Sequence, residues 1–220
     1  MAESASKVDG VTQINGIYAA LGRFTVEFSR MVDAMETDLY FTIGGNQLLL
    51  RSITAEMTAD PLRRAWRSIM TQATELSPQD VDVLAKLSSE ISKVINLRND
   101  WAHGTWFVGF GSDEVQSQAS LMRFKNLAKG LARPSQLESR PTAAYIEQAA
   151  THTNVIAQAV QVFGGTVHMR QTTDTKVRPS DRVRITKKDG HSEIQVSGNG
   201  MDWVATEWPL LLSSTGGPGD

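Results

Sequence analysis

No cysteine occurs among the 220 residues of the chain, which excludes a disulfide framework, a thiolate metal site and a cysteine nucleophile. This absence also fits a reducing compartment. Long apolar runs are missing too: the longest, such as Leu48-Leu49-Leu50, span a few residues, whereas a membrane-spanning helix needs roughly 20. The opening MAESASKVDG is polar and leads into no apolar stretch, so it does not predict a secretion signal. We therefore expect a cytoplasmic protein without a membrane span.

A large excess of one charge is also lacking. The net charge of −2 and the isoelectric point near 6.1 argue against a protein held on nucleic acid mainly by bulk electrostatics, although a local RNA site remains open. The four histidines show no paired ligand spacing, so we predict no zinc site and no cofactor. A helix-turn-helix signature is absent as well, which disfavours a regulator that binds duplex DNA.

Apolar residues recur at spacings of three and four over most of the chain, which predicts a mainly α fold with one substantial core. The clearest helix begins with Ser77 as N-cap and Pro78 at the first helical position. The last helix is expected to stop at Gly164-Gly165. Together the patterns predict helices at about 14–43, 47–57, 61–76, 78–103 and 141–163.

Two segments are richer in strand formers. Residues 105–110 and 115–124, separated by Gly-Ser-Asp-Glu at 111–114, predict a β-hairpin after the fourth helix. Beyond Thr166 the chain is polar, with a short candidate hairpin at 183–186 and 194–196. We therefore predict a helical domain at 1–165, with its hairpin at about 105–124, and a partly irregular C-terminal tail at 166–220. Trp203, Trp208 and residues 210–212 could dock on the core, while 213–220 looks frayed.

Arg98 is an unusual residue on the fourth predicted helix. At about 100° per residue it falls within roughly 20° of Ile91, in the middle of the apolar stripe. An uncompensated buried guanidinium is costly, so Arg98 should meet a carboxylate, a bound phosphate or a water-filled cleft. The structural alternative is an internal ion pair with Glu27, Asp33 or Glu36 of the first helix.

His103 stands at the end of the same helix, just before Gly104, where the helix dipole favours the imidazolium. Such a histidine suits proton transfer near neutrality, although it could equally close the helix by hydrogen-bonding the last carbonyls. Asn99 and His103 are four residues apart and share a helix face. Arg98 and His103 are five apart and lie roughly 140° from each other, so on one helix they flank a site without converging on it.

The run Arg98-Asn99-Asp100-Trp101-Ala102-His103 resembles the Arg-polar-x-x-x-His signature of the HEPN superfamily. Its context adds specificity: a capped helix with a clean stripe, an Asn directly after the Arg, an Ala-His-Gly ending, and a long amphipathic first helix that holds GRFTVEFSR. The resemblance covers about 14–104 and 141–163. It implies an up-down helical bundle, with the hairpin as an insertion after the motif helix.

The resemblance also implies a metal-independent endoribonuclease, in which two protomers form one composite cleft that cuts single-stranded RNA. Arg98 would hold the scissile phosphate, His103 would act on the 2′-hydroxyl or the leaving oxygen, and Asn99 would orient the phosphate or His103. A prokaryotic toxin–antitoxin or phage-defence setting is implied, with a homodimer and an antitoxin or defence-system protein as partners.

Further residues are candidates for RNA contact. Trp101 and Trp106 flank the motif and could stack on bases, or they could belong to the core or a dimer contact. The basic stretch from Arg170 to Lys188 could help to hold RNA or could be a solvated surface. The alternative function is a non-catalytic helical interaction and dimerisation module in which Arg98 is a structural ion pair.

Overall fold

A computed structural model describes residues 2–44, 47–73, 75–108, 119–125, 135–139, 141–173, 175–188, 191–198 and 201–206. The predicted mainly helical fold is confirmed. The helix that Ser77 caps begins at Pro78, as predicted. The elements are α1 Ala2–Ile43, α2 Gln47–Thr54, α3 Ala59–Ala73, α4 Pro78–His103, β1 Thr105–Val108, β2 Ala119–Lys125, β3 Ser135–Ser139, α5 Ala143–Thr172, α6 Pro179–Arg182, β4 Val183–Lys188, β5 His191–Gly198 and β6 Met201–Thr206.

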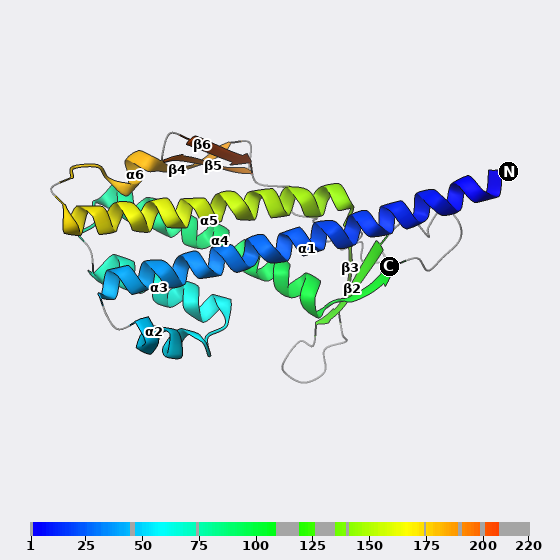
Figure 1. Ribbon diagram of the computed structural model, residues 1–220, viewed down its shortest axis with the longest axis horizontal. Coiled ribbons are helices and arrows are strands. Elements are labelled where there is room, and N and C mark those ends of the chain that lie inside the picture. The colour runs from blue at the N-terminus through cyan, green and yellow to red at the C-terminus, as the bar shows by residue number, and fades with distance from the viewer. Residues whose placement is uncertain are drawn as a thin grey trace, which may run out of the picture.

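The long helices α1 and α5 lie side by side, and α4 lies behind them (Figure 1). α1 and α5 run parallel, because Gly16 lies next to Ala143 near one end and Phe41 lies beside His168 near the other. The succession α3, α4, α5 alternates in direction, as an up-down bundle requires. The short α2 returns the chain between α1 and α3, so the first and last long helices point the same way.

The apolar stripe predicted on α1 forms the centre of the core. Ile17, Phe24, Met31, Met35 and Leu39 are buried there, while Leu21 and Phe28 are half-buried at its rim. The core continues through Leu84, Leu87, Ile91 and Val94 of α4 and through Ile146, Ile156, Val160 and Phe163 of α5. One cluster therefore joins all the long helices.

The predicted end of the last helix at Gly164-Gly165 is wrong, because α5 continues to Thr172. Gly164 permits a close approach between helices: a Cβ added there would lie 2.0 Å from Oδ1 of the buried Asp38 on α1. The glycine is needed for packing, so it does not mark a helix end. The predicted domain boundary at residue 165 consequently falls inside a continuous helix.

Two antiparallel three-stranded sheets accompany the helices, in the orders β1-β2-β3 and β4-β5-β6. In the first sheet Trp106 pairs with Leu121, so the predicted hairpin is present in the described residues, and β3 is a strand that the sequence pattern did not predict. In the second sheet Ile185 pairs with Ile194, which confirms the second predicted hairpin; β6 adds an unpredicted third strand.

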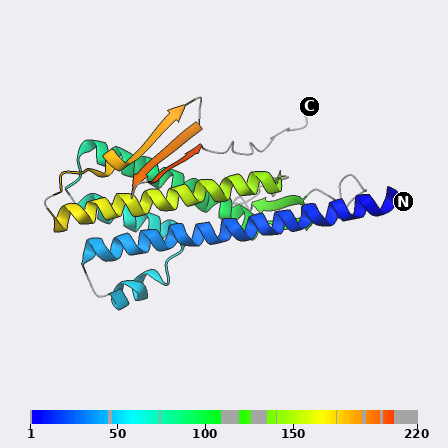
Figure 2. The ribbon, with the colours of Figure 1, turned by 45° about the horizontal axis from the view of Figure 1, so that its top comes forward.

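The second sheet lies over α5 and is packed on it (Figures 1 and 2). Val183, Ile185, Ile194 and Val196 point into the main core cluster and are buried. The described residues between 166 and 206 are therefore part of the same packed body, contrary to the expected tail. The alternating residues of the strands supply an apolar face that the low aliphatic content of this segment concealed. Trp208 and the segments 210–212 and 213–220 lie outside the described residues.

Candidate functional site

The last turns of α4 carry the motif residues Arg98, Asn99 and His103. This end of the helix is held against α1 and α5 by Trp101, which is 6% exposed. Its ring meets Phe24 edge to face at 4.6 Å between centroids and meets Tyr145 at 6.2 Å. Such aromatic contacts fix the helix end firmly, so the motif side chains project from a rigid support.

Arg98 is exposed to solvent, so the part of α4 where its spacing from Ile91 places it is not covered at this end of the helix. In the last turns of α4 Trp101 is buried, whereas Arg98, three residues earlier, is not. Its guanidinium lies 5.6 Å from the centre of the Phe28 ring, and its Nη1 donates to Oδ1 of Asn99 at 3.3 Å. Among the described residues no carboxylate pairs with Arg98.

The predicted alternative partners of Arg98 are engaged or placed elsewhere. Glu27 is buried and accepts from Arg30 at 3.3 Å. Asp33 and Glu36 line a small hollow between α1 and α2, together with Arg51. The structure therefore contradicts an ion pair of Arg98 with Glu27, Asp33 or Glu36.

His103 is the last residue of α4 and is exposed, while Asn99 is half-buried. The helix ends at Gly104, whose N–H donates to the carbonyl of Asp100 at 3.0 Å. Within the described part of the chain, no hydrogen bond or ion pair joins His103 to Arg98 or Asn99. The fold therefore brings Arg98 and Asn99 together and leaves the imidazole of His103 facing solvent.

Of the two predicted alternatives for Trp101 and Trp106, stacking on RNA bases or a place in the core, the fold uses the second. The burial of Trp101 contradicts base stacking on its ring, because the ring is enclosed by Phe24 and Tyr145. Trp106 is half-buried, and its Nε1 donates to the carbonyl of Trp101 at 2.7 Å. That bond satisfies one of the carbonyls that a helix end leaves without an intrahelical partner.

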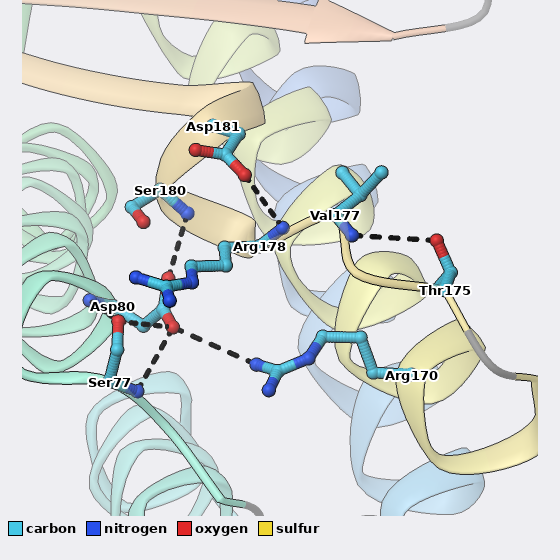
Figure 3. A network of polar contacts seen from close by, with 8 residues as sticks. All are labelled: Ser77, Asp80, Arg170, Thr175, Val177, Arg178, Ser180 and Asp181. Carbon is cyan, nitrogen blue, oxygen red and sulfur yellow. Dashed lines mark hydrogen bonds and ion pairs between the residues drawn. The ribbon is translucent and has the colours of Figure 1, made fainter.

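Buried polar clusters that the sequence analysis missed lie elsewhere on α4. Asp80, fully buried in the first turn, accepts from Ser77 N at 3.0 Å and from Ser180 N at 2.9 Å (Figure 3). Arg170 of α5 lies 3.8 Å away. Burial raises the pKa of Asp80, but the hydrogen bonds from Ser77 and Ser180 outweigh it and hold the pKa below its usual value. Asp80 thus ties α4, α5 and α6 together.

Glu90 forms a second buried cluster, in the middle of α4. Its carboxylate accepts from Lys93 at 2.9 Å and from Ser192 of β5 at 2.8 Å, and Nε2 of His152 on α5 lies 3.6 Å from it. Burial raises the pKa of Glu90, but the contacts with His152, Lys93 and Ser192 lower it by more, so that the pKa is about 2. This cluster fastens the second sheet to α4 and α5. At 4% exposure for Glu90 and 2% for His152, it is closed to a substrate.

A third buried acid, Asp38 on α1, accepts from Trp66 Nε1 of α3 at 3.1 Å. Burial raises the pKa of Asp38 well above its usual value, against the smaller lowering effect of the Trp66 hydrogen bond. Asp38 therefore stays protonated to higher pH than an exposed aspartate, and it packs against Gly164. Its role is the joining of α1, α3 and α5.

The described residues contain no group of three or more His, Asp or Glu side chains that could hold a metal ion. The chemistry available at the exposed end of α4 is therefore that of a guanidinium, an amide and an imidazole: anion binding, orientation and proton transfer. In the same residues, no helix is both long and apolar enough to cross a membrane.

Comparison of the chain with known protein families, with curated proteins and with solved structures finds no match.

Proposed function

We propose that this protein is a metal-independent endoribonuclease of the HEPN type, acting on single-stranded RNA as a homodimer in a toxin–antitoxin or phage-defence setting. The observation that carries the proposal is the state of Arg98: an exposed guanidinium without a carboxylate partner in the described residues, on the same helix end as an exposed histidine. A guanidinium in this state is available for a phosphate, which it can bind through two parallel hydrogen bonds.

The chemistry requires no further group. His103 takes the proton from a ribose 2′-hydroxyl, and the 2′-oxygen attacks the adjacent phosphorus. The bond from phosphorus to the 5′-oxygen breaks, and a second, protonated His103 supplies the proton that this oxygen needs. Arg98 stabilises the charge on the non-bridging oxygens, and Asn99 holds the guanidinium in position. The products are a 2′,3′-cyclic phosphate and a free 5′-hydroxyl.

A second protomer supplies what one helix lacks. Residues five apart on a helix point roughly 140° away from each other, so Arg98 and His103 of one chain do not face a common phosphate. Two copies of α4 arranged about a two-fold axis can place the Arg98 of one chain opposite the His103 of its partner. The proposal therefore requires a dimer through this face.

The test is cleavage of labelled single-stranded RNA by the purified chain in the presence of a chelator. We expect Arg98→Ala and His103→Ala to lower the rate at least about a hundredfold, the usual effect of removing a general acid–base group or an oxyanion-binding group. Arg67→Ala is the matched control, because Arg67 is an exposed arginine on α3. Full activity in His103→Ala would exclude the proposed mechanism.

A monomeric mass by light scattering at micromolar concentration would also exclude the composite site. A cleavage product with a 3′-hydroxyl end would exclude 2′-hydroxyl attack, whichever residues proved necessary.

A non-catalytic interaction module is the second candidate, and α2 favours it. Leu48, Leu49 and Ile53 are exposed by 75%, 62% and 51% and give α2 an exposed apolar face. Removing it by Leu49→Glu should abolish self-association or partner capture if this face is the working surface. RNA cleavage that survives Leu49→Glu unchanged would assign the function to α4 instead.

A further inference from the structure

An open cleft of about 490 Å3 lies between the C-terminal half of α5, the turn before α6 and the end of β5. Its lining includes Gln158, Gln161, His168, Met169, Val177 and Arg182. The volume falls within the roughly 300 to 1,000 Å3 of small-molecule sites. The cleft adjoins α6, which Asp80 ties to the start of α4, whereas the motif lies at the other end of that 26-residue helix, roughly 39 Å long.

The charge around the cleft is positive. Arg182 lines it and is exposed, its guanidinium has no partner among the described residues, and the described residues of the lining include no carboxylate. Lys176 and Arg178 are exposed on the turn before α6, beside the lining residue Val177. Seven of the chain's 22 lysines and arginines lie between residues 170 and 188, against two of its 24 acids, so the rest of the chain is net acidic. This segregation of charge favours an anionic ligand.

The rest of the lining fits a flat ring with polar edges. Gln158 and Gln161 are three residues apart on α5, and their amides have no partner among the described residues, so each offers a donor and an acceptor. Met169, which is 54% exposed, and Val177 offer apolar surface for a ring face. The imidazole of His168 is held beside the Phe41 ring at 5.0 Å.

From this combination we propose that the cleft between α5 and β5 binds a nucleoside phosphate, with Arg182 on the phosphate and the amides of Gln158 and Gln161 on the edge of the base. The nucleoside phosphate is either a free nucleotide or one unit of an RNA strand. Binding of one unit of an RNA strand rests on the proposed RNA-cutting function. In that case the cleft anchors the strand at a distance from the cutting site.

A glycine in the lining allows the cleft to be tested by substitution. Gly165 lines it, and a Cβ added at Gly165 meets no atom within 4 Å, so a larger side chain there grows into the open cleft. Leucine also favours helix more than glycine does. Gly165→Leu should therefore fill the cleft while the protein keeps or raises its melting temperature.

The experiment measures binding to full-length His103→Ala, which keeps the RNA uncut. The probes are AMP, by calorimetry, and a labelled short oligouridylate, by fluorescence anisotropy. Added Arg182→Gln and Gly165→Leu substitutions should each weaken binding at least about tenfold, the loss expected for a charge-assisted hydrogen bond or a blocked site. An added Arg67→Gln substitution, at an exposed arginine on α3, should leave the binding of AMP unchanged.

The outcomes distinguish a free nucleotide from an RNA strand, and both from binding of an anion without recognition of a base. Binding of AMP assigns a free nucleotide, and binding of the oligouridylate alone assigns an RNA strand. Equal binding of inorganic phosphate or of oligoglutamate would overturn recognition of the base. No binding of either probe at about 1 mM, or binding unchanged by both cleft variants, would overturn the site altogether. RNA cleavage that depends on Arg98 and His103 is measured separately, so failure here leaves the nuclease proposal intact.

Discussion

In the first half of α4 two charged side chains, Asp80 and Glu90, are buried and each is held by several protein groups, whereas in its last turns Arg98 and His103 face solvent. Asp80 receives a hydrogen bond from the N-cap Ser77 and Glu90 receives one from Lys93 of the same helix, and each also receives one from a segment about a hundred residues away. Arg98 has a ring and a neighbouring amide as its contacts, and His103 is exposed.

This difference distinguishes charged side chains that stabilise the fold from those that can bind a ligand. A buried carboxylate surrounded by donors stabilises the fold and resists protonation, because each donor favours its charged form. An exposed guanidinium without a carboxylate partner in the described residues contributes little to folding and can bind an incoming anion. The two ends of the same helix therefore predict opposite responses to substitution.

The largest effect is expected from Glu90→Ala. The substitution takes the acceptor from Lys93 and Ser192 inside the core, so the free energy of unfolding should fall by about 3 to 5 kcal/mol. Urea denaturation followed by circular dichroism measures it. Glu90→Gln, which keeps an acceptor, should lose less. A loss below about 1 kcal/mol would remove the distinction between the two halves of α4.

Lowering the pH should destabilise the protein through Glu90, in the same half of α4. The pKa of Glu90 in the folded chain is about 2, below its ordinary value of 4.5, so its contribution is present above pH 4.5 and is lost as the pH falls toward 2. That contribution is on the order of 3 kcal/mol. Unfolding free energies measured across this range should fall less steeply in Glu90→Gln. Equal slopes would show that Glu90 titrates normally.

The paired glycines of α5 extend the comparison to helix packing. Gly164→Ala places a Cβ 2.0 Å from Oδ1 of Asp38, which is enclosed between helices, and should cost about 2 to 3 kcal/mol. Gly165→Ala meets open space and should raise stability by about 0.5 to 1 kcal/mol. Thermal melts of the two variants give the comparison directly. Equal melting temperatures would contradict the tight contact with Asp38.

The smallest effect on stability is expected from Arg98→Ala. An exposed contact between a guanidinium and an aromatic ring contributes about 0.5 to 1 kcal/mol, so the variant should stay folded with a loss in that range. The same denaturation measurement serves here. A loss comparable to that of Glu90→Ala would mean that Arg98 is structural, and loss of RNA cleavage in the variant could then no longer be read as loss of a catalytic group.

The sequence by itself determined the helical class, the start of α4 at Ser77 and Pro78, the stripe of α1 and both hairpins, because these depend on local periods and caps. It also placed Arg98, Asn99 and His103 at one helix end. It did not predict β3, β6 or the continuation of α5, since edge strands and an inter-helix glycine are defined by their partners.

Only the tertiary structure decided which charges are buried. The position of Arg98 on the stripe predicted a buried guanidinium, but a stripe gives the direction of a side chain and not whether another element covers that part of the helix. Arg98 was left in solvent at the end of α4, while α6 and β5 covered Asp80 and Glu90. Burial is a property of what packs against a residue, and those partners lie about a hundred residues away in the chain.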